Sequence, residues 1–235
     1  MIEVKNLTKR YGTNTALNNV SFTVEEGTIV GFLGPNGAGK STTMNIITGY
    51  LSATSGSVTV QGKNTLENPN EVKKLIGYLP ELPPLYMDMT VKEYLNFMYE
   101  LKGVKLDRKQ HIGEICRLTK IDNVYTRLIG NLSKGYKQRV GIAQAILGHP
   151  KLILFDEPTT GLDIEERCHF YEIFQQLNGI CPVLIASHIT EDIVEGCTNT
   201  IILKNGIVIL QEKTKDIKPS LQEVYLSCMH GTSFI

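Results

Sequence analysis

A glycine-rich stretch from Gly34 to Ser41 contains residue types that could do chemistry at a defined spacing. Its sequence, GPNGAGKS, fits the pattern G-x4-G-K-S/T. Glycines let the backbone curl so that successive N–H groups face phosphate oxygens, and a helix beginning near Lys40 adds the positive end of its dipole. We expect Lys40 to reach the β- and γ-phosphates of a nucleotide and Ser41 to hold Mg²⁺. The stretch therefore predicts a phosphate-binding loop.

Two consecutive carboxylates, Asp156 and Glu157, follow the apolar run Leu152–Phe155. The run predicts a buried strand, and Asp156 at its carboxyl end would lie beside the Mg²⁺. Glu157 could point to the opposite side and polarise a water molecule for attack on a phosphate. A plain strand cap has the same pattern, so this signal is weak without the loop at Gly34–Ser41.

The elements that must position these motifs alternate between strands and helices. Short apolar runs predict strands at Ile2–Val4, Val20–Val24, Thr28–Leu33, Ser57–Val60, Ile76–Leu79, Leu152–Phe155, Val183–Ala186, Ile201–Leu203 and Ile207–Leu210. Helices are predicted at Ser41–Thr48, from a Thr90/Glu93 capping box onward, at Glu165–Leu177 and after Pro219. This alternation implies an α/β core with a largely parallel sheet. The stretch 82–147 has no strand signal, and we expect it to be a helical subdomain inserted in a single domain spanning 1–235.

Composition excludes several classes of protein. The 235 residues include 24 basic and 24 acidic side chains and 42% hydrophobic residues, enough to bury a core and to exclude disorder over most of the length. A net charge of zero argues against nucleic acid as a partner. No apolar run approaches the ~20 residues that cross a bilayer. The five cysteines form no CxxC pair, so neither a zinc site nor a disulfide framework is expected. These features predict a soluble protein of the reducing cytosol.

Four motifs occur in the order seen in ABC-type ATPases, namely Gly34–Thr42, Leu132–Arg139, Asp156–Pro158 and Ser187-His188. The chain resembles ABC transporter ATP-binding subunits from about Ile2 to Gln211. Residues 78–81 and 132–136 are most similar to the ABC-2-type branch, whose members are mostly exporters. The resemblance implies the ABC ATPase fold: a P-loop NTPase core with a largely parallel sheet, an antiparallel β subdomain and the inserted helical subdomain. It also implies ATP and Mg²⁺ as ligands.

The resemblance assigns roles at the nucleotide residue by residue. ATP-binding residues would be Tyr11, Gly34, Pro35, Asn36, Gly37, Ala38, Gly39, Lys40, Ser41 and Thr42. Tyr11 resembles the aromatic residue that stacks on adenine, although a surface tyrosine in a turn is the alternative. Glu157 and His188 would be catalytic, with His188 as the switch histidine that contacts the γ-phosphate. The other histidines, His111, His149, His169 and His230, are expected at the surface.

The resemblance also implies a second ATP-binding subunit. Ser133 and Gly135 match the signature loop, in which Lys134 replaces the usual Gly and Tyr136 the usual Gln. In the family this loop contacts the ATP bound to the other subunit, and Ser133 is also a plausible helix N-cap. Asp163 matches the D-loop, which crosses the same interface. A two-fold dimer follows, formed either by two copies of this chain or with a related chain.

Glu81 departs from the family pattern, because most ABC cassettes carry Gln at this position as a ligand of Mg²⁺. A carboxylate oxygen suits Mg²⁺ as well as an amide oxygen does, so Glu81 is predicted as a metal ligand with Ser41 and Asp156. The alternative is an ordinary acid at the end of a strand. Leu85, Tyr86 and Met87 follow in a proline-rich loop, and we expect them to receive a cytoplasmic helix of a membrane partner unless the loop is tucked onto its own subdomain.

The preferred function is a transport motor: ATP binding closes the dimer, hydrolysis reopens it, and an integral-membrane permease converts this motion into transport. Such a subunit would lie in the cytoplasm, bound to the membrane face through its permease, and the branch resemblance favours export. The alternative is a soluble ABC ATPase, for example one in cluster assembly. A degenerate nucleotide-binding regulator is disfavoured because the Lys, Ser, Asp, Glu and His of the motifs are all present.

Overall fold

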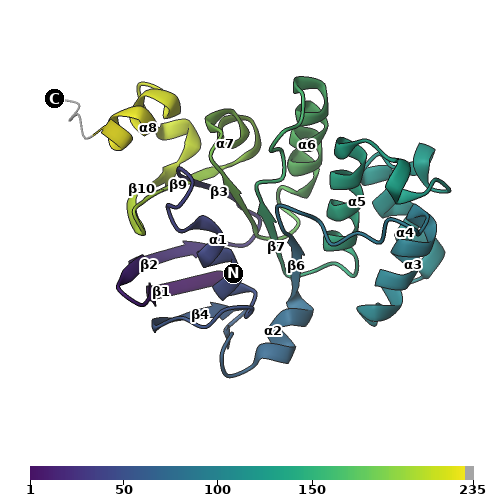
Figure 1. Ribbon diagram of the computed structural model, residues 1–235, viewed down its shortest axis with the longest axis horizontal. Helices are drawn as coiled ribbons and strands as arrows, with labels where there is room; N and C mark the ends of the chain where they lie inside the picture. Colours follow the sequence, from purple (N-terminus) through teal and green to yellow (C-terminus); the bar gives the residue numbers. More distant parts are fainter. Residues whose placement is uncertain (231–235) are drawn as a thin grey trace.

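The computed structural model describes residues 1–230, and two β-sheets and their helices form its framework (Figure 1). The strands are β1 (Ile2–Tyr11), β2 (Asn14–Val24), β3 (Ile29–Leu33), β4 (Ser55–Val60), β5 (Lys63–Asn64), β6 (Ile76–Leu79), β7 (Leu152–Asp156), β8 (Val183–Ser187), β9 (Asn199–Lys204) and β10 (Ile207–Lys213). The helices are α1 (Lys40–Ile47), α2 (Pro69–Leu75), α3 (Val91–Leu101), α4 (Arg108–Leu118), α5 (Lys134–Ile146), α6 (Ile164–Leu177), α7 (Thr190–Gly196) and α8 (Leu221–His230).

The larger sheet has six strands in the order β10-β9-β3-β8-β7-β6. All neighbouring pairs except β10 with β9 are parallel, which confirms the largely parallel sheet expected from the sequence. Every residue of β3, β7 and β8 is buried, because helices or the second sheet cover both faces. The carboxyl ends of β3, β7 and β8 therefore lie side by side, and the loops that follow them meet at one edge.

Alternate residues of the central strands feed two separate cores. Ile153 and Phe155 of β7 pack on one face with residues of α3 to α7, whereas Leu152 and Leu154 pack on the other face with α1 and the smaller sheet. The smaller sheet is antiparallel, in the order β2-β1-β4-β5. Met44 of α1 is fully buried between the two sheets. Helix α1, which begins at Lys40, is therefore clamped from both sides.

The stretch 82–147 contains α3, α4 and α5 and two short 3₁₀ turns, Asp122–Val124 and Ile129–Asn131. Thr90 and Glu93 form the expected capping box at the start of α3. Val91, Tyr94 and Leu95 are buried on one face of this helix, whereas Leu101, its last residue, is 67% exposed although the apolar spacing of the helix places it on the same face. Figure 1 shows these helices gathered at the end of the molecule away from the smaller sheet. Within residues 1–230, no helix combines the length and apolar character needed to cross a membrane.

Several elements differ from the sequence expectation for identifiable reasons. Strands β1 and β2 are longer than the segments predicted at Ile2–Val4 and Val20–Val24. Bulges near Asn6 and Asn19, both with positive φ, break the two-residue alternation, so the sequence pattern did not reveal the full length of either strand. Helix α2 was not predicted. It buries only Val72, so it has no apolar periodicity and relies on Pro69 at its first turn.

Candidate functional site

The loop between β3 and α1 has the backbone geometry expected of a phosphate cradle. Gly37 and Gly39 have φ of +80° and +108°, which side-chain-bearing residues rarely adopt. A Cβ atom at Gly34 would lie 2.5 Å from the carbonyl oxygen of Leu203, so the chain passes closer to β9 than any other residue allows. The loop is further tied down because the Gly34 N–H donates to Ser187 O at 3.3 Å and the Ala38 N–H donates to Pro35 O at 3.1 Å.

Lys40 is held inside this loop and is only 5% exposed. Its Nζ donates to the Gly34 carbonyl at 2.6 Å and the Pro35 carbonyl at 3.3 Å, and it lies 3.2 Å from Glu157 Oε1. A buried ammonium requires such partners, because desolvation without them is costly. The three acceptors keep the charge at the loop, where it can bind an anion.

Ser41 and Asp156 place two hard oxygen atoms together. The Ser41 hydroxyl donates to Asp156 Oδ1 at 3.3 Å, and Asp156 is 4% exposed. Burial raises the pKa of Asp156 to about 6; the Ser41 hydrogen bond and Lys40 oppose the shift, while the charges of Glu157 and Glu81 add to it. A divalent cation at these oxygens would favour the ionised carboxylate, so the donor set fits Mg²⁺.

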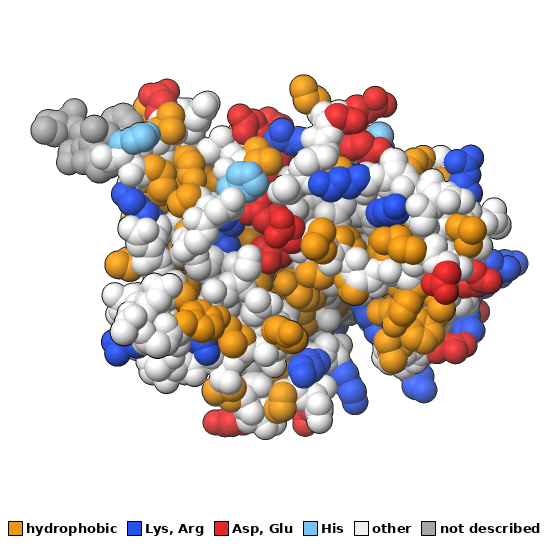
Figure 2. Space-filling view, in the orientation of Figure 1, with side chains coloured by type: hydrophobic (Ala, Val, Ile, Leu, Met, Phe, Trp, Pro, Cys, Tyr) orange, Lys and Arg blue, Asp and Glu red, His pale blue; other side chains and the backbone are white. Residues whose placement is uncertain are grey.

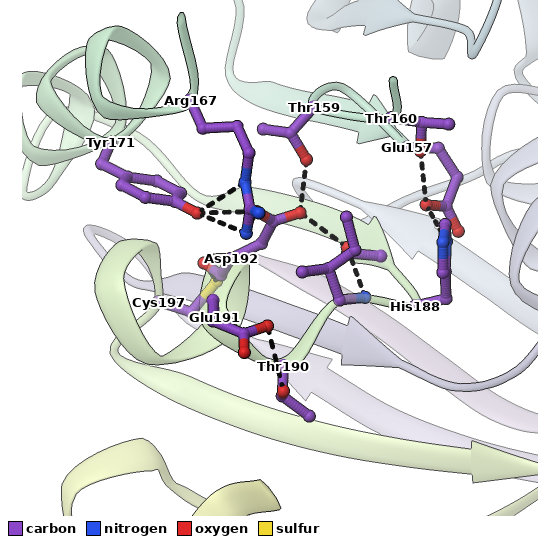
Figure 3. A network of polar contacts seen from close by, with 12 residues as sticks. Glu157, Thr159, Thr160, Arg167, Tyr171, His188, Thr190, Glu191, Asp192 and Cys197 are labelled. Atoms are coloured by element: carbon purple, nitrogen blue, oxygen red, sulfur yellow. Dashed lines mark hydrogen bonds and ion pairs between the residues drawn. The ribbon is translucent and has the colours of Figure 1, made fainter. Parts of the chain in front are cut away.

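Glu157 and His188 come from neighbouring loops, and their side chains point toward each other (Figure 3). Glu157 Oε2 lies 2.7 Å from His188 Nδ1 and accepts a hydrogen bond from the Thr160 hydroxyl at 3.1 Å. The backbone of Glu157 has a φ of +50°, and its N–H donates to Ala186 O at 2.9 Å. A left-handed non-glycine residue is uncommon and clusters at functional sites. The Glu157 carboxylate is therefore in contact with three side chains, those of Lys40, Thr160 and His188.

These residues surround a cleft of about 430 Å³, which lies near a group of acidic side chains beside a histidine in Figure 2. The cleft is lined by Tyr11, Asn14, Ala16, Pro35, Asn36, Gly37, Gly39, Lys40, Ser41, Thr42, Glu81, Glu157, Thr160 and His188. Predicted residues from five separate parts of the sequence are thus brought together. Gly34, Ala38 and Asp156 do not line the cleft but hold the loop and Ser41 from beneath.

The signature and D-loop residues lie outside this cleft. Ser133 is the N-cap of α5 and accepts a hydrogen bond from the Tyr136 N–H at 3.3 Å, and Asp163 is the N-cap of α6. Lys134 Nζ donates to the Thr160 carbonyl at 2.6 Å, so the two loops touch each other. A Cβ atom at Gly135 would lie 2.3 Å from the Glu166 carboxylate, so a side chain here would displace that carboxylate.

Sequence reasoning missed some residues of the site and misplaced one histidine. Asn14 and Ala16 line the cleft, but no motif or spacing marked them. Thr160 also lines the cleft, and it is the first residue of the stretch 160–163 that resembles the D-loop. His111 was expected at the surface and is instead 2% exposed. It lies on the buried face of α4, and its Nε2 accepts the Gly148 N–H at 2.9 Å. Burial lowers the pKa of His111, and His149 lowers it further. A single histidine in a helical sequence gives no indication that it will be buried.

Comparisons with known proteins agree with the geometry. A family model described as "ABC transporter" matches residues 17–160. The uncharacterised ABC transporter ATP-binding protein YxlF of Bacillus subtilis is 36% identical over 223 residues, covering 94% of this chain and 74% of that protein. The lantibiotic transport ATP-binding protein SrtF of Streptococcus pyogenes is 35% identical over 228 residues, 96% of each chain.

A solved structure of a dimeric ATP-binding cassette in a post-hydrolysis state, bound to ADP and Pi, superposes with a TM-score of 0.80 at 29% identity, covering 91% of this chain and 98% of that one. This similarity confirms the expected ABC ATPase fold. The matched family model spans the phosphate loop, the signature loop and both carboxylates of the site. The chain belongs to the ABC transporter family, as one of its ATP-binding ATPase subunits.

Proposed function

We propose that this chain is the motor subunit of a transporter, which couples the hydrolysis of Mg²⁺-ATP to export through a separate membrane permease. The observation that supports it most is the meeting of a phosphate cradle, a buried lysine, a Ser–Asp oxygen pair and a Glu–His pair around one cleft. These are the groups that phosphoryl transfer to water requires.

Each group has a role that its position permits. The backbone N–H groups of the loop and Lys40 bind the phosphates, and Tyr11, 49% exposed at the rim, offers a face to the adenine. Ser41 and Asp156, with Glu81 at the rim, would hold Mg²⁺, which neutralises phosphate charge when bound. Glu157 accepts a proton from the attacking water, and His188, hydrogen-bonded to Glu157, contacts the γ-phosphate.

The decisive experiment separates binding from hydrolysis at Glu157. Glu157→Gln keeps the shape and one acceptor oxygen but removes the base, so we expect ATP binding within about threefold of wild type and a fall in turnover of about 10²- to 10⁴-fold. Binding is measured with a fluorescent ATP analogue and turnover by phosphate release. Wild-type turnover in this variant would remove Glu157 from the catalytic role.

An exposed apolar surface on the helical stretch supports a membrane partner. Leu82 is 83% exposed, and Tyr86 and Met87 are each 49% exposed. Tyr86 makes an edge-on contact with the ring of Phe97 on α3, with 5.6 Å between ring centroids. Figure 2 shows apolar side chains gathered over α3. Leu85, predicted to share this surface, packs in part against the core instead. Leu82, Tyr86, Met87 and Phe97 would receive a short cytoplasmic helix of the permease.

This surface is connected to the signature loop through backbone hydrogen bonds. The carbonyl of Met87 accepts the Gly130 N–H at 3.0 Å, and the carbonyl of Met89 accepts the Ile129 N–H at 2.9 Å. Ser133 lies three residues after Gly130. On the ATP side, Gln138 of α5 donates to the Glu81 carbonyl at 3.3 Å. A movement at either loop would therefore be transmitted to the other, which is what coupling to transport requires.

Polar substitutions on this surface test the coupling. We expect Tyr86→Ser with Met87→Ser to leave basal ATPase activity of the isolated chain within about twofold of wild type and to abolish ATPase stimulation by the permease and transport by the reconstituted complex. A matched control is Leu66→Ser, an exposed leucine outside the helical stretch. Transport and stimulation at wild-type levels in the double variant would place the permease elsewhere.

The resemblance of residues 78–81 and 132–136 to the ABC-2-type branch favours export. One relative, SrtF, is named for lantibiotic transport, so we propose cargo of a lantibiotic type for this chain as well. The subunit would then lie at the cytoplasmic face of the membrane, held by its permease. Inside-out vesicles carrying the complex should accumulate cargo when ATP is added outside them. Accumulation only in vesicles of the opposite orientation, with ATP sealed inside, would reverse the direction.

A further inference from the structure

Asp192, on the first turn of α7, is fully buried and receives four hydrogen bonds, yet it lies outside every motif considered above (Figure 3). Its Oδ2 accepts from the hydroxyl of Thr159 and, at 2.8 Å, from the hydroxyl of Ser187. Its Oδ1 accepts from Tyr171 at 2.9 Å and from Arg167 at 3.2 Å, both on α6. A buried carboxylate with all its partners present is rigid, because losing any one leaves a costly unpaired group.

The two oxygens of this carboxylate make different connections. Oδ2 ties Thr159, two residues after Glu157, to Ser187, the residue directly before His188. Oδ1 ties α7 to α6. The Oδ2 bonds thus join the two loops that carry the Glu157–His188 pair, whose atoms lie 2.7 Å apart. Thr159 and Ser187 are 1% and 0% exposed, so water does not replace either bond.

Within residues 1–230, the other side-chain connection between these loops is the Glu157–His188 hydrogen bond itself, and the His188 side chain is 39% exposed. Direct backbone contact is limited to the Glu157 N–H, which donates to Ala186 O at 2.9 Å and fixes only the beginning of each loop. Beyond this point β7 has ended and β8 ends at Ser187, whose Oγ also accepts the Ile189 N–H at 3.0 Å and closes the turn around His188. The direction in which His188 leaves β8 therefore depends on the hydroxyl that Asp192 holds.

We propose that Asp192 is a positioning residue for ATP hydrolysis: through Thr159 and Ser187 it fixes the loop of Glu157 against the loop of His188. Asp192 itself does not line the cleft. This inference rests on the proposed function, since it acts only if Glu157 and His188 perform the reaction. Misplacing a catalytic group by about 1 Å can lower a rate about 10²-fold, so a carboxylate outside the cleft can control turnover.

Asp192→Asn is the first test, because the amide keeps the shape but offers only one acceptor oxygen and presents N–H groups to a donor. We expect kcat to fall about 10- to 100-fold with KM for ATP changed by less than about threefold. Thr159→Val and Ser187→Ala, each removing one Oδ2 bond, should each lower kcat, and Thr159→Ser should restore most of it. Tyr171→Phe removes an Oδ1 bond and the bonds from Arg167 to the Tyr171 hydroxyl but leaves both Oδ2 bonds, so it should lower kcat less than Thr159→Val.

A merely structural role would give a different pattern. Thr119→Val is the matched control, because Thr119 is 0% exposed and donates to Ile115 O at 2.8 Å within the helical stretch. It should lower thermal stability as Thr159→Val does while keeping wild-type kcat. Wild-type kcat in Asp192→Asn, or equal kcat losses in the two Thr→Val variants, would overturn the proposal.

A double-mutant cycle with His188 separates positioning from a general loss of activity. If Asp192 acts through the alignment of His188, adding Asp192→Asn to His188→Ala should lower kcat by less than about twofold more. A full further loss in that background would overturn the proposal. His188→Ala and Glu157→Gln alone report on the catalytic roles in the proposed function: normal hydrolysis in both would remove both residues from the reaction, whereas slow hydrolysis in both with normal Asp192→Asn would reject only the positioning role.

Discussion

Lys40 and Glu157 form a buried ion pair that also involves the loop carbonyls, so the two groups assigned to phosphate binding and to catalysis hold each other in place. A bound γ-phosphate would compete with Glu157 for the lysine and thereby release the carboxylate toward the attacking water. The pair is thus expected to act at successive stages of one reaction. This arrangement explains why both side chains are almost entirely buried in a site that must admit a large polar ligand.

Glu81 provides a prediction at the residue scale. It lines the cleft, and its charge contributes to the raised pKa of Asp156 behind Ser41. We expect Glu81→Gln to retain turnover within about threefold, because an amide oxygen can replace the carboxylate oxygen at Mg²⁺, and Glu81→Ala to need about tenfold more Mg²⁺ for half-maximal rate. ATPase rate against Mg²⁺ concentration is the measurement. Three superimposable curves would leave Glu81 as an ordinary surface acid.

At the scale of elements, helix α5 connects the signature loop to the core, and side chains satisfy backbone groups at both of its ends. Ser133 caps its first turn. At the other end, Lys102 Nζ donates to the carbonyl oxygens of Gln144 and, at 3.4 Å, Ala145. Burial lowers the pKa of Lys102 to about 8. A helix fixed at both ends can transmit a displacement along its length, as the proposed coupling requires.

Lys102 makes the stability of the fold depend on pH. The unfolded chain keeps this proton up to its ordinary pKa of 10.5, whereas the folded chain loses it near 8, so between these values the unfolded state binds more protons and stability rises with pH. Relative to Lys102→Met, the free energy of unfolding of wild type should increase by about 2 kcal/mol from about pH 7 to about pH 9.5. Urea unfolding of both proteins at the two pH values measures this.

The control for this prediction is Lys105→Met, which removes an exposed lysine from the same turn. Its unfolding free energy should stay parallel to that of wild type over the same pH range. A constant difference between wild type and Lys102→Met at all pH values would mean that the Lys102 ammonium keeps its proton in the folded state.

For the whole molecule, one chain presents the cleft and the signature loop as separate surfaces. The loops that contain Ser133 and Asp163 contact each other, but neither residue lines the cleft. We propose a two-fold dimer in which each signature loop closes on the ATP of the other subunit, so that each site is completed in trans. We also propose that residues 82–147 form a helical subdomain inserted in the core of a single domain. Its helices would rotate relative to the core when the dimer closes.

The dimer predicts a nucleotide-dependent change of size. Glu157→Gln should elute as a dimer with ATP and as a monomer without it, because ATP stays intact between the subunits. Adding Ser133→Arg should return the protein to the monomer in the presence of ATP. Since this change also removes a helix cap worth about 1 kcal/mol, Asp107→Ala, which removes the N-cap of α4, is the matched control and should still dimerise. A dimer in the Ser133→Arg variant would exclude this interface.

The sequence alone determined the local parts of this protein. The G-x4-G-K-S pattern, the apolar run before Asp156 and Glu157, and the Thr90/Glu93 capping box all depend on residues close together in the chain, whose chemistry can be interpreted without a fold. Continuous apolar strands alternating with helices were likewise enough for the largely parallel sheet, because a strand buried on both faces cannot accommodate polar residues.

Only the tertiary structure decided what depends on distance between remote segments. Contacts with segments remote in the chain determine that His111 is buried, that Leu101 is exposed and that β1 and β2 continue through their bulges. The local sequence pattern contains no information about these contacts. The Asp192 carboxylate is the strongest example, since Thr159 and Ser187 are 33 and 5 residues away from it in the chain. From the sequence alone, a single Asp near the start of a short helix would be interpreted as a solvated surface residue. It becomes a connection between two loops because the parallel strands β7 and β8 end at the same edge of the sheet.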